Sequence, residues 1–211
     1  MPANAREEWD RVFSRLDRAP GSKDAWLEHW RDLLEANRDS PVLDLGCGAG
    51  DDAHSLSQLG FEVVAADFSE KALELTRRRT PEAETRHVDL ARGLPFPGAH
   101  FGTIVASLSL HYFPRPKTVE VLEDVWRCLV PGGHLLARLN STNDPYYAVM
   151  HKEEIEPSFY LVNGFPKRLF DRDDIVELFS NWTIEEVEER TTSRYGYEKV
   201  LWEIAARKPE G

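Results

Sequence analysis

The stretch "PVLDLGCGAGDDAHSL", residues 41–56, decides the fold. A short apolar run comes first, and glycine then occupies alternate positions as Gly46, Gly48 and Gly50. Glycine adopts backbone conformations that other residues avoid and allows close approach of a neighbour, but its flexibility carries an entropic cost. Two acids follow and open a run of helical character. The stretch therefore predicts a buried strand, a glycine loop and a helix, and the loop either binds a ligand or makes a tight turn.

The alternation of strand and helix continues beyond this stretch. Short apolar runs predict strands, and runs with helical periodicity predict helices. The predicted strands cover residues 41–46, 61–67, 84–89, 101–110 and 134–140, and the predicted helices cover residues 51–60, 69–81 and 118–130. Ser69 is a helix-capping residue, and Pro81 ends the same helix. Such alternation favours a parallel sheet with helices on both faces.

The two ends of the chain depart from this alternation. Apolar residues at helical spacing predict one helix around Trp9 and Phe13 and another around Trp26 and Trp30. Residues 141–170 are rich in proline, tyrosine, phenylalanine and charge, and they show no clear period. We expect the N-terminal helices and this aperiodic insert to lie outside the sheet.

The C-terminal part predicts a helix followed by two strands. Asp171 caps the predicted helix at residues 171–181, and residues 182–190 and 198–208 have the composition of strands. Two consecutive strands without a helix between them must pair antiparallel. The sheet is therefore expected to end in an antiparallel hairpin.

Composition and charge limit the class of protein. The chain has 211 residues, of which 41% are hydrophobic and 10% aromatic, and this is typical of one packed domain. The net charge of −11 would repel a polyanion, so nucleic acid is not an expected partner. The two cysteines, Cys47 and Cys128, indicate no disulfide framework. No stretch resembles a signal peptide or a membrane span, so we expect a cytoplasmic protein without a membrane partner.

The glycine loop is placed where a ligand would bind. In open α/β sheets, ligands bind at the carboxyl ends of the strands, where each loop enters a helix. Asp67 ends the second predicted strand, where its carboxylate can accept hydrogen bonds from both hydroxyls of a ribose. A ribose-containing ligand with an adenine is therefore expected.

Two common nucleotide motifs do not fit this loop. The dinucleotide motif G-x-G-x-x-G needs glycine at position 51, which is Asp51, and no G-K-[ST] sequence follows the glycines. Asp51 and Asp52 also place negative charge where a pyrophosphate would lie. Asp44, just before the glycines, suits a ligand with a positively charged amino group. S-adenosylmethionine has this group, a ribose and an adenine, and it carries no phosphate.

Five blocks of the chain resemble the class I S-adenosylmethionine-dependent methyltransferases. These blocks, within residues 40–140, are "VLDLGCGAG", "VVAADFS", "HVDL", "FGTIVASLSLHYF" and "CLVPGGHLLARLN". The resemblance implies that Asp67 binds the ribose and that Phe68 lies against the adenine. It also implies a methionine site made by Asp44, Gly46, Cys47 and Gly48, an adenine edge at Asp89 and Leu90, and a pocket floor at Ser107 and Leu108.

The resemblance also implies a fold and a division of the chain. The expected fold is a doubly wound, mostly parallel, seven-stranded Rossmann-like sheet with a terminal antiparallel hairpin. We expect a single methyltransferase domain over residues 1–211, and the small-molecule branch, including tellurite-resistance-type enzymes, is the nearest match. Its expected parts are an N-terminal helical cover (1–38), a cofactor-binding core (40–140), a lid insert (141–170), and a helix with the hairpin (171–211).

His111 and Tyr112 are the candidate catalytic residues. In the family, the loop after the fourth strand faces the methyl group, although both side chains could equally be part of ordinary pocket packing. The aromatic residues of the insert could line a lid or belong to a core. Histidines are scattered without metal-ligand spacing, so no metal site is predicted.

The predicted activity is methyl transfer from S-adenosylmethionine to a small-molecule acceptor by in-line displacement. A general base is needed only if the acceptor must lose a proton. A protein methyltransferase and a non-catalytic S-adenosylmethionine-binding regulatory protein remain alternatives. The expected assembly is a monomer or a homodimer.

Overall fold

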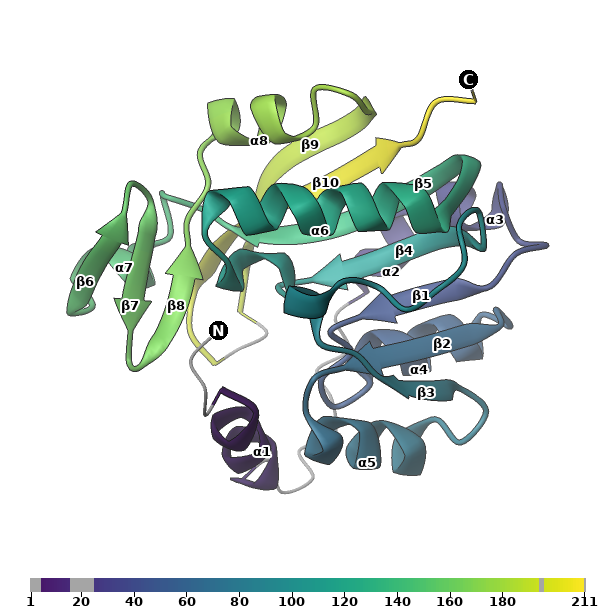
Figure 1. Cartoon of the computed structure of the whole chain (residues 1–211), viewed down its shortest axis with the longest axis horizontal. Helices are drawn as coiled ribbons and strands as arrows, with labels where there is room; N and C mark the ends of the chain where they lie inside the picture. The colour runs from purple at the N-terminus through teal and green to yellow at the C-terminus, as the bar shows by residue number, and fades with distance from the viewer. Residues whose placement is uncertain (1–4, 16–24, 194–195, 211) are drawn as a thin grey trace.

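The central element of the fold is a seven-stranded sheet with the order β3-β2-β1-β4-β5-β10-β9 (Figure 1). The computed structural model describes residues 5–15, 25–193 and 196–210, so residues 1–4 and 16–24 of the predicted N-terminal cover lie outside it. The strands are β1 (Val42–Leu45), β2 (Val63–Asp67), β3 (Glu84–His87), β4 (Phe101–Ser107), β5 (Leu129–Asn140), β9 (Thr183–Thr192) and β10 (Lys199–Arg207). The first five are parallel, and β10 pairs antiparallel with both β5 and β9. The predicted fold, including the terminal hairpin, is confirmed.

Helices cover both faces of this sheet. They are α1 (Ala5–Arg15), α2 (Trp26–His29), α3 (Arg31–Glu35), α4 (Asp51–Gln58), α5 (Glu70–Arg79), α6 (Arg115–Cys128), α7 (Pro145–Val149) and α8 (Arg172–Leu178), with 3-10 turns η1 (Leu90–Arg92) and η2 (Leu110–Tyr112). Ser69 caps α5, and Asp171 forms a capping box with Asp174 at the start of α8, as predicted. Among the described helices, none is long and apolar enough to cross a membrane.

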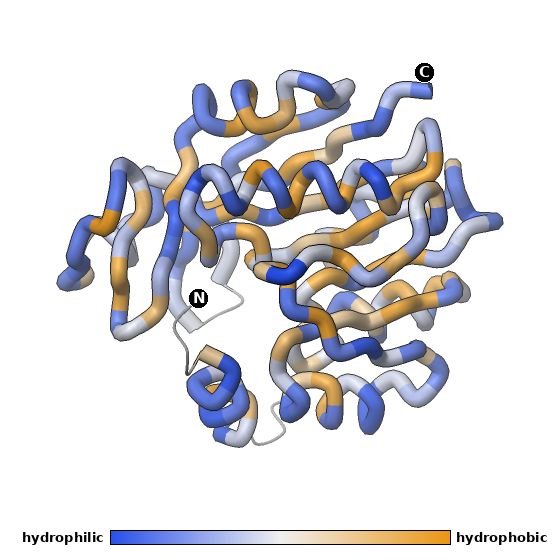
Figure 2. The backbone as a smooth tube through the Cα atoms, viewed as in Figure 1, coloured by the Kyte–Doolittle hydropathy of each residue, from blue (hydrophilic) through white to orange (hydrophobic). Residues whose placement is uncertain are grey.

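The strands are buried on both faces because successive side chains point in opposite directions. On β1, Leu43 and Leu45 belong to the core cluster that includes α6 and α8, whereas Val42 belongs to the cluster that includes α2 to α5. In Figure 2 the central strands are mainly orange, and the covering helices alternate between orange and blue along their length. This two-sided burial explains why the strands read as continuous apolar runs in the sequence.

The N-terminal helices separate into two different environments. Trp26 and Trp30, on α2 and at its end, are buried in the sheet core and are not part of a cover. In contrast, α1 lies between α5 and β8 (Figure 1). On α1, Asp10 Oδ1 accepts hydrogen bonds from Ser69 Oγ at 2.5 Å and from the Lys71 backbone N–H at 3.3 Å. These bonds hold α1 at the N-terminus of α5.

The insert at residues 141–170 is regular, so the prediction of an aperiodic segment is wrong. After α7 it forms a separate antiparallel sheet of β6 (Lys152–Glu156), β7 (Phe159–Val162) and β8 (Phe165–Arg168). The strands are short, and a register shift in β6 disturbs the alternating pattern. Asn163 and Gly164, with φ of 51° and 82°, make the tight turn between β7 and β8. An Asn-Gly pair between two apolar runs is a strong hairpin signal in a sequence.

Candidate cofactor and acceptor site

The carboxyl ends of β1, β2, β4 and β5 open into one cavity of about 350 Å³. Most of the predicted site residues line it, as do α1 and β8. The lining residues predicted from the sequence are Gly46, Gly48, Asp67, Phe68, Asp89, Leu90, Ser107, Leu108, His111 and Tyr112. The structure therefore gathers residues from four separate loops around a single space. The role assigned to each of them stays a prediction.

Asp67 is fixed in orientation by the backbone around it. Its Oδ2 accepts a hydrogen bond from the Gly48 N–H at 2.9 Å, and its Oδ1 accepts one from the Ser69 N–H at 2.8 Å. Burial raises the pKa of Asp67, while the hydrogen bonds from Ser69 and Gly48 oppose the rise. Each carboxylate oxygen has lone pairs for a further hydrogen bond, so the carboxylate can still accept bonds from a diol.

The first two glycines of the loop have different neighbours. Gly46 has a φ of +80°, and a Cβ there would collide with the Cβ of Ser109. Gly48 has a φ of +55°, and a Cβ there would lie 3.4 Å from the Phe13 ring at the cavity wall. Gly46 is therefore required by packing between two loops, whereas the space beside Gly48 belongs to the cavity.

Asp44 and Cys47, both assigned to the methionine site, do not line this cavity. Asp44 is buried, and its Oδ2 accepts a hydrogen bond from the Ala53 N–H at 2.9 Å in the first turn of α4. Cys47 is also buried, with its Sγ 3.6 Å from Thr76 Oγ1. Burial raises the pKa of this thiol well above its usual value, and the charges of Asp44 and Asp67 raise it further. Both residues are therefore buried under the glycine loop and do not face the cavity.

The two acids after the glycines are compensated by neighbours. Asp51 forms an ion pair with Arg79 of α5. Asp52 is buried, and its Oδ1 accepts a hydrogen bond from Trp26 Nε1 at 3.0 Å. Acids also interact favourably with the positive end of a helix macrodipole in its first turn. The crowding of negative charge expected from the sequence is therefore relieved by α5 and α2.

The loops after β3 and β4 complete the cofactor side of the cavity. Asp89 caps η1, because its Oδ1 accepts a hydrogen bond from the Ala91 N–H at 3.0 Å. Leu108, after β4, has a φ of +56°, which is unusual for leucine. Its N–H donates to the Arg138 carbonyl at 3.0 Å. Leu108 lines the cavity, and strained backbone positions of this kind are often found at functional sites.

His111 and Tyr112 contact a lysine that the sequence did not single out. Lys167 on β8 places its Nζ 3.0 Å from Tyr112 Oη and 3.4 Å from His111 Nε2. The same Nζ lies 4.3 Å from the centre of the Tyr112 ring. Burial and the charge of Lys199 lower the pKa of Lys167 to about 7. Burial also lowers the pKa of His111 well below its usual range, and the two lysines add to this effect.

Lys199 and Asn140 also line the cavity and were not predicted as site residues. The Lys199 Nζ donates to Asn140 Oδ1 at 2.8 Å and to Asp144 Oδ2 at 3.0 Å. Desolvation lowers the pKa of Lys199, although Asp144 opposes this. Lys199 is a buried cation at the start of a mainly apolar strand, "KVLWEIAAR". A buried charge of this kind in the sequence could have indicated a site.

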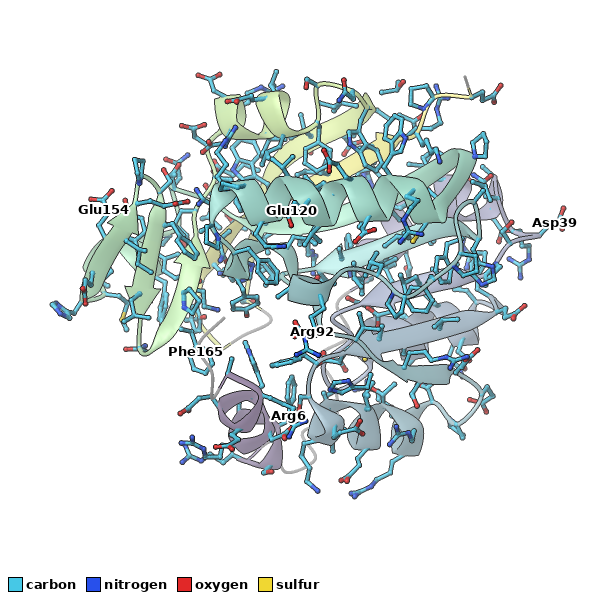
Figure 3. The ribbon with its side chains drawn as sticks, in the orientation of Figure 1. Arg6, Asp39, Arg92, Glu120, Glu154 and Phe165 are labelled. Atoms are coloured by element: carbon cyan, nitrogen blue, oxygen red, sulfur yellow. The ribbon has the colours of Figure 1, made fainter. Side chains whose placement is uncertain are left out.

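Aromatic side chains from α1, η2 and β8 form the outer wall. The Trp9 ring lies 5.3 Å from that of Tyr112 and 5.0 Å from that of Phe165. Figure 3 shows Phe165 on the side of β8 that is nearest α1. Phe13 stacks on Trp9 at 5.7 Å and lines the cavity too. The N-terminal helix and the insert therefore meet over the cavity through their aromatic residues.

Three buried polar atoms of residues that line the cavity have no hydrogen-bond partner among the described residues. They are Ser109 Oγ, His111 Nδ1 and Asn140 Nδ2. Buried polar groups are normally paired, so unpaired ones at a cavity indicate where a ligand or water binds. Elsewhere, the described residues contain no cluster of three or more histidine, cysteine or acidic side chains that could hold a metal ion.

Comparisons with known proteins agree with this architecture. Residues 42–133 match the family described as a methyltransferase domain. A demethylmenaquinone methyltransferase of Clavibacter sepedonicus is 32% identical over 143 residues, which make up 64% of this chain and 57% of that protein. A second enzyme of that description, from Listeria welshimeri, is 32% identical over 52% of this chain and 49% of its own length. The chain thus spans about half the length of these curated relatives.

Solved structures share nearly the whole fold. A SAM-dependent methyltransferase from Methanosarcina mazei has a TM-score of 0.77 at 22% identity, covering 93% of this chain and 100% of that one. The 1,6-didemethyltoxoflavin-N1-methyltransferase of Burkholderia thailandensis has a TM-score of 0.68 at 17% identity, covering 98% and 88%. The sheet order and the site at its carboxyl edge define a Rossmann-like methyltransferase fold. Together with the sequence match of residues 42–133 to a methyltransferase domain, these similarities support a class I S-adenosylmethionine-dependent methyltransferase.

Proposed function

We propose that this protein binds S-adenosylmethionine and transfers its methyl group to a small-molecule acceptor. The observation that carries the proposal is one cavity with two unlike ends. At one end, Asp67 and Gly48 present a carboxylate and an open backbone at the carboxyl edge of the sheet. At the other end, aromatic and basic side chains from α1, η2 and β8 enclose a second space.

The cofactor end suits a nucleoside. Asp67 has acceptor capacity for the two hydroxyls of a ribose, and its orientation is fixed by two backbone donors. Phe68, Asp89 and Leu90 line the adjoining wall, where an adenine would find an apolar surface and an acid. The unpaired Ser109 Oγ lies beside the glycine loop, where it can meet the polar methionine portion.

The chemistry comes from the cofactor, and the protein supplies alignment and exclusion of water. When bound, S-adenosylmethionine offers a sulfonium methyl carbon, to which the acceptor's lone pair bonds as the carbon–sulfur bond breaks and S-adenosylhomocysteine leaves. His111 and Tyr112 line the acceptor end and lie against Lys167. We assign them to orienting the acceptor, and Lys167 can take a proton because its pKa lies near 7.

A small acceptor fits better than a protein side chain or a nucleic acid. The rings of Trp9, Tyr112 and Phe165 pack against one another along one wall of the acceptor end, which supports a small acceptor. The net charge of −11 disfavours a polyanion. A cytoplasmic location and a monomeric or homodimeric state remain predictions from the sequence.

The proposal is tested by measuring binding and turnover separately. Calorimetry with S-adenosylhomocysteine should give one site per chain, whereas NAD should give no binding heat. Incubation with S-adenosylmethionine and an acceptor panel should then produce S-adenosylhomocysteine only when an acceptor is present. No heat with either sulfur ligand, with clear binding of NAD, would refute the proposal. Cofactor binding without turnover on any acceptor would instead favour the regulatory alternative.

A further inference from the structure

The end of the cavity assigned to the methyl acceptor contains more hydrogen-bond donors than atoms that can accept a hydrogen bond. Lys167 Nζ contacts Tyr112 and His111, and among the described residues no carboxylate pairs with it. Asn140 turns its Oδ1 toward Lys199, so its unpaired Nδ2 is a second donor at this end. Unpaired buried donors are costly, because they lose hydrogen bonds to water without replacement.

His111 adds a third donor. It is buried, and its Nε2 lies 3.4 Å from Lys167 Nζ. An ammonium group can only donate, so when Lys167 is charged the Nε2 atom must accept and the proton must be on Nδ1. This Nδ1 is the atom that has no partner among the described residues. His111 and Lys167 both line the cavity, so this part of the lining contains a ring N–H as well as an ammonium.

The charged side chains at the acceptor end also favour an anionic ligand. Lys199 is neutralised by Asp144 at 3.0 Å, but Lys167 brings a second positive charge to the same wall without an acid of its own. A bound sulfonium would add a third positive charge to a partly desolvated space. Like charges in a medium of low dielectric repel strongly, so a negative charge on a ligand would stabilise the charged form of Lys167 here.

The shape of this end favours a flat ligand. Trp9 and Tyr112 meet edge to face, and Phe165 lies 5.0 Å from Trp9, so the wall is made of rings. Tyr147 lines the cavity with its ring 4.8 Å from Lys199 Nζ. Aromatic side chains pack favourably against a planar ring of a ligand.

We propose that the methyl acceptor is a planar aromatic molecule with an anionic oxygen, and that Lys167 binds this oxygen. The inference rests on the proposed function and identifies its substrate class. Asn140 Nδ2 and His111 Nδ1 supply further donors to the acceptor, and the rings of Trp9 and Tyr112 hold its aromatic face. Lys167 is a specificity-determining residue in this scheme.

The test compares matched anionic and neutral probes on the protein saturated with S-adenosylhomocysteine. The probes are benzoate, 4-hydroxybenzoate and 2-naphthoate, each paired with its neutral carboxamide, and affinity is measured by calorimetry at pH 6.5. A charge-assisted contact to Lys167 should make at least one anion bind about 10- to 100-fold tighter than its amide. In Lys167→Met this preference should fall to about 1, whereas Lys117→Met, on the exposed face of α6, should keep it.

A second test measures the pH dependence of probe affinity on the wild-type protein alone, so it does not depend on whether a variant folds. The pH series uses benzoate and 2-naphthoate with their carboxamides; the carboxylates are ionised throughout pH 6 to 9 and the amides do not titrate, so only the site titrates. The charged or titratable groups facing Lys167 are His111, Tyr112, and Lys199 with its partner Asp144. His111 is already neutral, so affinity for the anion should fall above about pH 7 as Lys167 loses its proton, while affinity for the amide stays constant.

The outcomes separate this inference from the proposed function. Equal affinity for anions and amides, no binding of either, or a preference that persists in Lys167→Met would overturn the inference while leaving cofactor binding intact. Failure of S-adenosylhomocysteine to bind would remove the proposed function and, with it, this inference. A preference for the anion that depends on Lys167 and declines with pH would establish it.

Discussion

Replacing Gly46 with alanine should destabilise the fold, because this glycine separates two loops of the site. At a φ of +80°, an L-residue costs about 1–2 kcal/mol. The new Cβ would also collide with the Cβ of Ser109, and relieving such overpacking costs about 1–3 kcal/mol more. We therefore expect Gly46→Ala to lower the free energy of unfolding by about 2–5 kcal/mol, measured by urea denaturation.

The neighbouring glycine supplies the matched control. Gly48→Ala also adopts a left-handed conformation, at +55°, but its Cβ would only touch the Phe13 ring at 3.4 Å. It should cost about 1 kcal/mol of stability, and it should weaken S-adenosylhomocysteine binding because the methyl group enters the cavity.

A double mutant isolates the collision from the backbone effect. In a Ser109→Gly background the colliding Cβ is absent, so the further change Gly46→Ala should cost only the backbone penalty of about 1–2 kcal/mol. If Gly46→Ala is as stable as the wild type, or if its cost is unchanged in the Ser109→Gly background, the packing argument is refuted.

Three further predictions concern the two ends of the cavity. Asp67→Asn should weaken S-adenosylhomocysteine binding about tenfold in calorimetry, because the amide loses the charge and its single oxygen can accept only one of the two backbone hydrogen bonds; unchanged affinity would contradict the assignment. At pH 6, Lys167→Met should have a higher free energy of unfolding than the wild type. Denaturation experiments should show this difference decreasing by about 2–3 kcal/mol between pH 6 and pH 9. The folded pKa, about 7, lies below the unfolded value of 10.5, so the unfolded state binds more protons between them. Finally, hydrogen exchange should show α1 and β8 gaining protection together when S-adenosylhomocysteine binds, and protection confined to the glycine loop would argue against a shared cover.

The parallel sheet could be predicted because its determinants are local. Each strand is a short apolar run, and each following helix has its own cap, as at Ser69 and Asp171. The largest difference in extent is in β5, which begins at Leu129, whereas the predicted strand begins at residue 134. Gly133 lies against Gly102 of β4, where a Cβ would be 2.9 Å from the Gly102 carbonyl oxygen. These glycines allow close strand approach, which a single sequence does not distinguish from a turn.

The acceptor end could be predicted only in part, because its contacts join distant segments. Tyr112 follows β4, and its partner Lys167 is on β8 of a sheet that the sequence analysis did not recognise. Lys199 reaches the cavity only because β10 pairs antiparallel with β5, which brings the start of β10 beside Asn140. Local periodicity describes each segment but contains no information on which loops meet.

The proposed acceptor is an anion and the sulfonium is a cation, and these opposite charges have a consequence for the proposed reaction. An anionic acceptor and a sulfonium lose charge together as the methyl group moves, so the transition state is less polar than the reactants. Water stabilises the separated charges more than the transition state, and a wall of rings such as Trp9, Tyr112 and Phe165 therefore favours the reaction by excluding water. A permanently charged lysine would oppose this gain by holding the anion in its ground state. Burial lowers the pKa of Lys167 to about 7 when no anion is bound, so its neutral form becomes accessible again once the acceptor has lost its negative charge, and this limits its cost to the reaction.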